Sequence, residues 1–259
     1  VALGLNKPIP EQYVIFVRRI LQGDLGDSLK LRRPAMPLIL ERIPRTLFLT
    51  LYSMVLSVVV ALPMAMISAL KKDTLIDQAI SGFVTLSLSM PGFWIAVILI
   101  LAFSVRLHLF PIAGFGRNLG ENIKFLFLPA LSVALAGSAV LVRNLRATIL
   151  DVLQSDFVRT ARAKGLPERQ VFFRHVLRNS LISTITLLGL RVAYSVGGAM
   201  IVETIFAIPG LGRFLLDSIS ARDYPVVQAI TLYFAAMVII VNLLTDIIYA
   251  VVDPRVRYG

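Results

Sequence analysis

Five long stretches of this sequence carry almost no charge, and they limit what the chain can fold into more than any other feature does. Four are free of charged residues and one contains a single arginine; they cover Thr46–Leu70, Gln78–Val105, Phe125–Val142, Asn179–Val202 and Tyr224–Thr245. A helix needs about 20 apolar residues to cross the hydrocarbon core of a bilayer. With 57% hydrophobic and 16% charged residues, the chain has too little charged surface for a soluble protein of this size.

The sequence therefore predicts an all-α fold, a polytopic membrane helix bundle. The alternative is a soluble bundle of buried core helices, but such helices are shorter and carry a polar stripe, which these stretches lack. We expect a transmembrane domain over residues 46–252, with spans at about 46–70, 83–106, 125–145, 180–203 and 225–250. The second stretch exceeds one span and contains Pro91, so residues 77–90 are predicted to be an interfacial or kinked segment leading into that span.

Lysine and arginine are distributed unevenly between the connections. Eight lie between residues 143 and 178, two end the first span and two lie in the tail, which makes 12 on one side if the spans alternate. The two short loops on the opposite side hold five. Because cytoplasmic loops carry the excess of positive charge, we place the loop 146–178 and the tail 253–259 in the cytoplasm.

The first 45 residues then form an external segment. Apolar residues at helical spacing in the sequence EQYVIFVRRILQ predict a short amphipathic helix on the outer face, and the following QGDLGDS predicts a turn. Five spans that begin outside leave the chain starting externally, and its first residue is Val1 rather than methionine. We therefore expect a sixth span upstream of this sequence.

The cytoplasmic loop has an organised pattern. Ser155 and Asp156 are typical helix-start residues whose oxygens accept unpaired backbone N–H groups, and Gly165 is a typical helix stop before Pro167 opens a second helix. That second helix is expected to have two different faces. The polar face comprises Gln170, Arg174, His175 and Arg178. The apolar face comprises Phe172, Phe173, Val176 and Leu177. The simpler interpretation is a basic loop on anionic lipid. A helix, glycine turn and helix favour a docking element for a cytoplasmic partner.

The segment DFVRTARAKGLPERQVFFRHVLRNSLI resembles the cytoplasmic signature of permease subunits in the dipeptide, oligopeptide and nickel group of ABC importers. The general importer pattern is Glu-Ala-Ala, three residues, Gly, nine residues and Ile-x-Leu-Pro, and Ala161, Gly165 and Leu177 match it. The departures at Arg159, Thr160 and Arg178 resemble the peptide-importer variant. Other segments are similar in the same order along the chain: LGLNKPIPEQY, GDLGDS, MPGFW, VETIFAIPGLGRFLLDSISARDYPVVQ and DPRVRYG.

This resemblance implies the type I ABC importer permease fold with six spans, in the inner (plasma) membrane of a bacterium. It implies a second homologous permease subunit, two cytoplasmic ATP-binding subunits that hold ATP and Mg, an external solute-binding protein and membrane lipid as partners. It places the contact with the ATPase subunit on a short helix and turn, at Arg159, Thr160, Ala161, Lys164, Gly165 and Leu166. No cofactor is implied on this chain itself.

Two further groups of residues are candidates for a role in transport. Arg191 lies within a span, where it either pairs with a substrate carboxylate in a translocation pathway or forms a structural pair. Tyr194, Ser195 and Met90 either line such a pathway or mediate helix packing. An external turn is predicted from Glu203, Pro209, Gly210, Gly212 and Arg213, with Glu203 paired near Arg213.

Several function classes lack their residues in this sequence. No lysine is followed by Ser or Thr, so the phosphate loop of an ATPase is missing, and the chain contains no Cys and no Gly-x-Ser-x-Gly. His108 and His175 are far apart in sequence, without a carboxylate cluster at metal-ligand spacing. We predict neither a catalytic nor a metal site, and the positive charge in an apolar chain argues against nucleic acid.

The predicted function is therefore that of a membrane permease subunit, not an enzyme, in an ATP-driven importer of di- or oligopeptides. Nickel, glutathione or another small solute carried by the same machinery is the alternative. A secondary transporter would need acidic residues for ion coupling, and a membrane enzyme would need paired catalytic groups; the spans contain almost no acids and no such pair.

Overall fold

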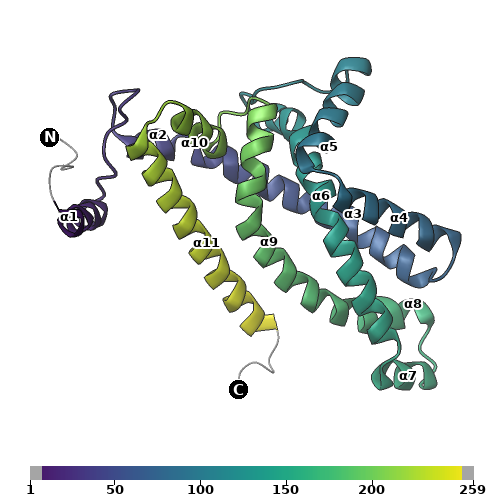
Figure 1. Ribbon diagram of the computed structural model, residues 1–259. Helices are drawn as coiled ribbons and strands as arrows, with labels where there is room; N and C mark the ends of the chain where they lie inside the picture. Colours follow the sequence, from purple (N-terminus) through teal and green to yellow (C-terminus); the bar gives the residue numbers. More distant parts are fainter. Residues whose placement is uncertain (1–7, 253–259) are drawn as a thin grey trace.

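The structure, a computed structural model, describes residues 8–252, except for the side chains of 182, 183, 185, 186, 190–198, 246 and 248–252. The described chain is helical and forms no sheet beyond one bridge between Asp27 and Pro34. Its helices are α1 (Ile9–Leu21), α2 (Ala35–Leu40), α3 (Ile43–Leu70), α4 (Leu75–Ser89), α5 (Gly92–Leu99), the π-helix η1 (Ile100–Arg106), α6 (Leu119–Leu153), α7 (Asp156–Ala163), α8 (Glu168–Gln170), the π-helix η2 (Val171–Leu177), α9 (Arg178–Ile205), α10 (Leu211–Ser220) and α11 (Tyr224–Val252) (Figure 1).

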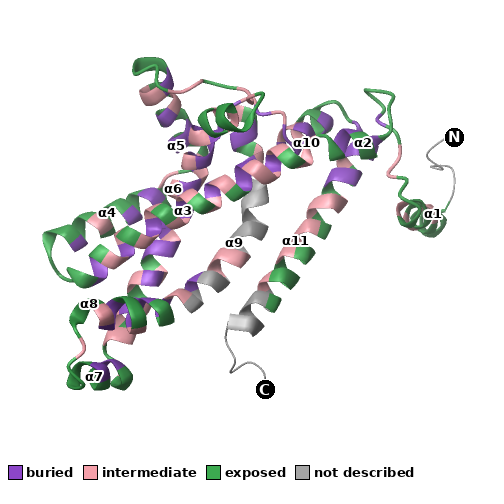
Figure 2. Cartoon of the chain, turned by 180° about the vertical axis from the view of Figure 1, so that it is seen from behind, coloured by how far each residue is buried: buried purple, intermediate pink, exposed green. Residues whose placement is uncertain are grey.

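Helix α3 packs along α6 with small side chains between them. The buried face of α3 includes Ser53, Ser57, Ala61 and Ala65. Small residues let two helix backbones approach closely, which is how membrane helices associate without a hydrophobic driving force. Large apolar residues point the other way, and Leu51, Val55 and Val59 are 57%, 58% and 60% exposed. Figure 2 shows this outward exposure along α3 and α11. Small side chains toward the neighbouring helix and large apolar side chains toward the outside are typical of a helix in contact with lipid.

The segment predicted to be kinked contains a sharp break. Helix α4 and the continuous pair α5 and η1 are bent by 107° at Met90 and Pro91. Met90 has an extended backbone (φ −89°, ψ 132°) because the residue before a proline is driven out of the helical region. The prediction of a kink in this stretch is confirmed.

The connections gather at two opposite ends of the bundle (Figure 1). At one end α2 and α10 lie close together, and the Gly114 N–H donates to the Phe206 carbonyl at 2.8 Å. At the other end lie the turn between α3 and α4 and the helices α7 and α8. The basic loop and the Lys71–Lys72 pair therefore share one end, as the charge distribution requires of a cytoplasmic side.

The expected number of spans stays a prediction. Three described helical stretches, 35–70, 119–153 and 224–245, are long and apolar enough to cross a membrane, and the bent pair would make a fourth. Helix α9 is 28 residues long, but many of its side chains lie outside the described residues. The sequence did predict the amphipathic helix α1, but it did not predict the short helices α2 and α10.

Candidate functional site

The predicted docking element, called the coupling element below, comprises Ser155–Leu177 with α7, α8 and η2. It follows α6 directly, because only Gln154 and Ser155 separate the two helices. Ser155 does occupy the N-cap position of α7, but its hydroxyl donates to the Val152 carbonyl at 2.6 Å and accepts no N–H. The helix start is confirmed and the predicted capping bond is wrong, since the hydroxyl closes the preceding turn of α6 instead.

The tip of the coupling element depends on a glycine. Gly165 has φ +75°, a left-handed conformation that L side chains adopt at a cost. Its N–H donates to the Arg162 carbonyl at 2.9 Å, which ends α7 and turns the chain toward Pro167. Across this turn the Arg162 guanidinium donates twice to the Glu168 carboxylate, at 2.8 and 3.2 Å. Both side chains are exposed, so this pair orders the turn but contributes at most about 1 kcal/mol.

The two faces of α7 differ sharply. Val158 is fully buried and Ala161 is 6% exposed, and both pack on η2 residues within one apolar cluster. Arg159, Thr160, Lys164 and Gly165 are exposed and Leu166 is partly buried. Five of the six predicted contact residues therefore reach the surface to some degree, whereas Ala161 faces the interior of this chain.

The second helix departs from the predicted faces at one residue. Phe172, Val176 and Leu177 are buried as the pattern requires, but Phe173 is 51% exposed. Residues 171–177 form a π-helix, whose wider turn rotates each residue less than an α-helix does. The assignment of Phe173 to the buried face is wrong for this reason. Beside it a groove of about 430 Å³ separates the end of α3 from the coupling element, and its lining includes Leu70, Leu153 and Phe173.

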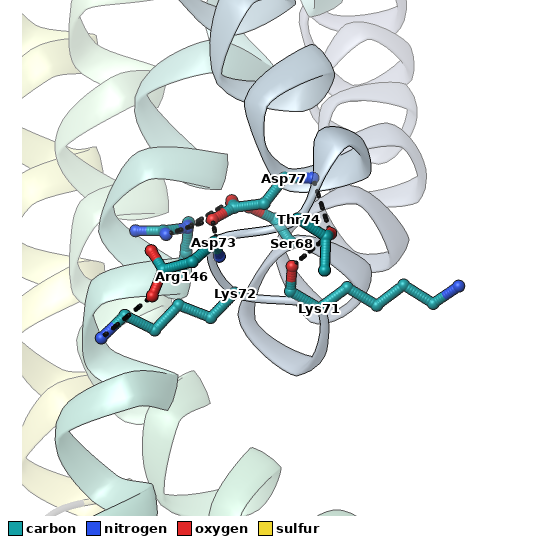
Figure 3. A network of polar contacts seen from close by, with 7 residues as sticks. All are labelled: Ser68, Lys71, Lys72, Asp73, Thr74, Asp77 and Arg146. Atoms are coloured by element: carbon teal, nitrogen blue, oxygen red, sulfur yellow. Dashed lines mark hydrogen bonds and ion pairs between the residues drawn. The ribbon is translucent and has the colours of Figure 1, made fainter.

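A polar network ties three helices together at the same end of the bundle (Figure 3). The Arg146 guanidinium on α6 donates Nε–H to Asp77 Oδ1 at 2.9 Å and Nη2–H to Oδ2 at 2.7 Å. The Asp73 backbone N–H donates to the same carboxylate at 3.0 Å, and so does the Ser68 hydroxyl of α3. The side chains of Asp77 and Arg146 are 6% and 27% exposed. The pair therefore holds the start of α4 on α6, seven residues before α6 ends.

Sequence reasoning missed this network. Arg146 counted only toward the charge of the cytoplasmic loop, because hydropathy does not pair residues far apart in sequence. One local signal was available, since Thr74 and Asp77 have the spacing of a helix N-cap, and the Thr74 hydroxyl accepts the Asp77 N–H at 3.5 Å. That signal predicts the start of α4 but not the partner of the carboxylate.

In the predicted external turn, a buried carboxylate binds the start of helix α10. Glu203 is fully buried; it accepts the Thr46 hydroxyl at 2.6 Å and the Arg213 backbone N–H at 3.0 Å. The Leu211 N–H donates to the same Thr46 hydroxyl at 2.8 Å. The contact with Arg213 is thus made by its backbone, while its guanidinium lies 3.8 Å from Asp217. Glu203 is therefore a structural residue paired at Arg213, as predicted, but the donor is the backbone N–H at the start of α10 and not the guanidinium.

The two glycines and the proline of this turn make close contacts within the chain. A Cβ at Gly210 would overlap the Glu203 carboxylate, and one at Gly212 would overlap the backbone of Met200. The Pro209 carbonyl accepts the Arg45 guanidinium at 3.2 Å. All of these contacts lie within the chain, so they hold α10 against α3 and α9.

The pathway candidates are only partly described. Met90 caps α4 at the break and packs against an apolar cluster of α3, α5, α6 and α9. Arg191, Tyr194 and Ser195 lie on the described backbone of α9, but their side chains are outside the described residues. In the part of the chain that could be searched, no three His, Cys, Asp or Glu residues come close enough to hold a metal ion.

Residues 61–258 match the model of the family described as binding-protein-dependent transport system inner membrane component. The chain belongs to this family. The permease is 42% identical to the oligopeptide transport system permease protein AppB of Bacillus subtilis, covering 98% of this chain and 83% of the relative. It is 37% identical to the dipeptide transport system permease protein DppB of Escherichia coli, covering 99% and 83%. It is 41% identical to the glutathione transport system permease protein GsiC of Pectobacterium atrosepticum, covering 99% and 82%.

Solved structures share the fold of this permease. A chain of the MetNI methionine ABC transporter in inward-facing conformations superposes with a TM-score of 0.69 at 16% identity, covering 84% of this chain and 97% of that one. An amino acid ABC transporter solved with histidines gives a TM-score of 0.61 at 18% identity, with coverage of 85% and 94%. The permease therefore has the all-α fold of ABC importer membrane subunits.

These findings establish the general role of the molecule. It is a multi-pass permease subunit, located in the inner membrane, of a binding-protein-dependent ABC import system. Its relatives are permease subunits, which are not enzymes themselves, and the family works with ATPase and binding-protein partners.

Proposed function

We propose that this permease imports di- and oligopeptides that an external binding protein delivers. Two cytoplasmic subunits bind ATP and Mg and drive the cycle, and a second homologous permease subunit completes the pathway. The support for peptides is that two of the relatives above are named for oligopeptide and dipeptide transport. The peptide-importer variant of the signature, at Arg159 and Thr160, agrees with this choice.

The observation that carries the coupling role is the two-sided construction of α7. A polar, exposed tip around Lys164 and Gly165 stands on an apolar base of Val158 and Ala161, which is packed into the end of the bundle. An ATPase subunit that held the exposed side would move the buried side with it. Because α6 leads into α7 through two residues, such a movement would reach the membrane helices directly. We assign Arg159, Thr160, Lys164, Gly165 and Leu166 to this contact, with Ala161 as the packing residue beneath it.

The proposed translocation pathway runs beside α9 and the break between α4 and α5. Met90 lies at that break. Arg191, Tyr194 and Ser195 follow one another along α9, and we propose that Arg191 pairs with the carboxylate of a peptide. A charge within a span costs roughly 2.5–3.5 kcal/mol, which favours a place facing a polar pathway over one facing lipid.

Glutathione is the second candidate substrate, because one relative of similar identity is named for glutathione transport. Nickel or another small solute carried by the same machinery follows it. The substrates are discriminated by uptake into vesicles that contain both permease subunits, with ATP and both ATPase subunits inside and the binding protein outside. Labelled dipeptide, oligopeptide, glutathione and Ni²⁺ are offered in parallel. Peptide uptake that excess glutathione and Ni²⁺ leave unchanged is the expected result.

Two glycines allow a matched test of the coupling contact. Gly165 and Gly23 have nearly the same backbone conformation, φ +75° and +77°, and neither has an atom within 4 Å of its would-be Cβ. Leucine at either position therefore meets the same backbone strain, about 1–2 kcal/mol, and no steric clash within the chain. Only Gly165 lies at the proposed contact.

We expect Gly165→Leu to lower ATP-dependent uptake by about tenfold or more, the factor that corresponds to a loss of about 1.4 kcal/mol at the contact, because the added side chain stands where the ATPase subunit binds. Gly23→Leu should retain uptake near the wild-type rate. The measurement is solute transported and ATP hydrolysed by the reconstituted complex, together with the amount of ATPase subunit retained by the permease on an affinity column. Equal uptake by the two leucine variants would remove the assignment of the coupling contact.

A further inference from the structure

Helix α1 is amphipathic. Ile9, Tyr13, Phe16 and Ile20 follow one another at helical spacing and form an apolar face, with Val17 and Leu21 at its side. Arg18 and Arg19 lie on the opposite side. The exposure of the apolar face is large: 81% for Ile9, 67% for Tyr13 and 82% for Leu21.

Nothing in the described part of the chain covers this face. No residue of α1 is buried, and none belongs to the three apolar clusters formed by the described residues. Figures 1 and 2 show α1 end-on, while α11 is seen along its length in both views. The axis of α1 therefore runs across the direction of α11. A helix that crosses the bilayer with the others would instead run along it.

A set of hydrogen bonds holds α1 at the α10 end of the bundle. The Arg19 guanidinium binds the Asp24 carboxylate at 3.0 Å, and that carboxylate accepts the Gly26 N–H at 2.9 Å. A few residues later, the Ser28 hydroxyl and the Leu29 N–H, the latter at 3.0 Å, donate to Asp223, which is 2% exposed. Asp223 lies between α10 and α11. The tether from α1 to this fixed point is therefore only a few residues long.

We propose that α1 lies flat in the external headgroup region of the bilayer. Its apolar face points toward the acyl chains, and Arg18 on the opposite face reaches the lipid phosphates. A wide apolar face, cations on the other face and an axis across the bundle are the properties of helices that lie in a membrane interface. The uncovered apolar face, the cation on the opposite face and the axis across α11 carry this assignment. This inference depends on the membrane location of the permease and not on its substrate.

Fluorescence quenching by lipid tests the proposal. Trp94 is the single tryptophan of the chain, so Trp94→Phe removes the tryptophan fluorescence of this subunit. The complete importer carrying Trp94→Phe alone, reconstituted in phosphatidylcholine vesicles, gives the background from the other subunits that is subtracted. Tyr13→Trp then reports from the apolar face and Arg18→Trp from the polar face. With lipid brominated near the top of its acyl chains, we expect the fluorescence of Tyr13→Trp to fall several-fold. The fluorescence of Arg18→Trp should change little.

The controls separate lipid from a protein partner. Phe16→Trp, at a site that is 39% exposed on the same apolar face, repeats the measurement if Tyr13→Trp does not assemble. Absent quenching at both Tyr13 and Phe16, or equal quenching at Arg18, would overturn the proposal. Cross-linking of Tyr13→Cys to the second permease subunit or to the binding protein, without lipid quenching, would overturn it in favour of a protein interface.

Discussion

Replacing Asp77 with asparagine should destabilise the permease strongly, because the Asp77 carboxylate is the shared acceptor of the polar network between α3, α4 and α6. The carboxylate accepts two guanidinium N–H groups, one backbone N–H and one hydroxyl, so an amide would turn N–H groups toward donors on at least one side. Removal of one partner from a buried ion pair costs about 3–5 kcal/mol. Because the Arg146 side chain is 27% exposed and keeps some water, we expect the lower end, about 3 kcal/mol.

The assay is unfolding of the purified permease in mixed micelles by increasing SDS, followed by the fluorescence of Trp94. Four proteins form a cycle: the wild type, Asp77→Asn, Arg146→Met and the double variant. We expect the double variant to lose about 2 kcal/mol less than the sum of the single losses, a coupling within the range for residues in contact. Asp217→Asn is the matched control, since its pair with Arg213 is exposed and long at 3.8 Å. It should change stability by less than about 1 kcal/mol.

Additive single losses, within about 0.5 kcal/mol, would refute the reasoning, because residues that do not interact add in this way. A loss in Asp77→Asn no larger than in Asp217→Asn would refute it as well. Arg146→Lys should lose an amount of stability that lies between those of the wild type and Arg146→Met. A single ammonium cannot replace the two parallel guanidinium bonds, so we expect it to lose about 1.5–3 kcal/mol.

Three further destabilising substitutions and one control follow from the packing, all measured by the same SDS unfolding. Gly210→Ala should cost about 1–3 kcal/mol because its Cβ overlaps Glu203, whereas Gly82→Ala, which meets no atom within 4 Å inside α4, should gain up to about 1 kcal/mol. Thr46→Val should cost about 1–3 kcal/mol, since it leaves a buried N–H and a carboxylate oxygen without their partner. Val158→Ala should cost about 1–3 kcal/mol through the cavity left under α7. An unchanged midpoint in any of the three destabilised variants would contradict the corresponding contact.

The sequence predicted most of the fold because the membrane imposes a simple rule. A helix in lipid must be apolar over its length, so charge-free stretches locate the helices directly. This rule predicts the first and last residues of each helix less well. Helix α6 runs over Leu119–Leu153, well beyond the charge-free residues 125–142, because a helix continues in water where its backbone bonds still form. Its start is set by the Asn118 side chain, which accepts the Glu121 N–H at 2.9 Å.

The short helices were not located in this way, for two different reasons. Helix α2 has 6 residues, too few for a periodic pattern to stand out from a loop. Helix α10 does carry apolar residues at helical spacing, Leu211, Phe214 and Leu215, but the glycines and the proline at its start indicated a turn. The apolar residues of α10 are buried only because α2 and α11 meet them, in a cluster that includes Ala35, Leu215 and Ile230. Such burial depends on segments nearly 200 residues apart. By contrast, the turn at Gly165 is local, and glycine followed by Leu-Pro was enough to predict it.

The site at Glu203 shows why residue types alone can suggest the wrong partner. A carboxylate near the end of a span invites an ion pair, and Arg213 is the nearest cation in the sequence. The first turn of a helix, however, has N–H groups without intrahelical partners and a partial positive charge. Helix α10 begins at Leu211, so its start offers these donors to Glu203, and Gly210 leaves the space for the carboxylate to reach them. The Arg213 side chain is then left to point outward, at the surface where Asp217 lies. Recognising α10 as a helix would have been sufficient to assign the carboxylate to its N-terminus, so the missed helix is the reason why the backbone donor was not predicted.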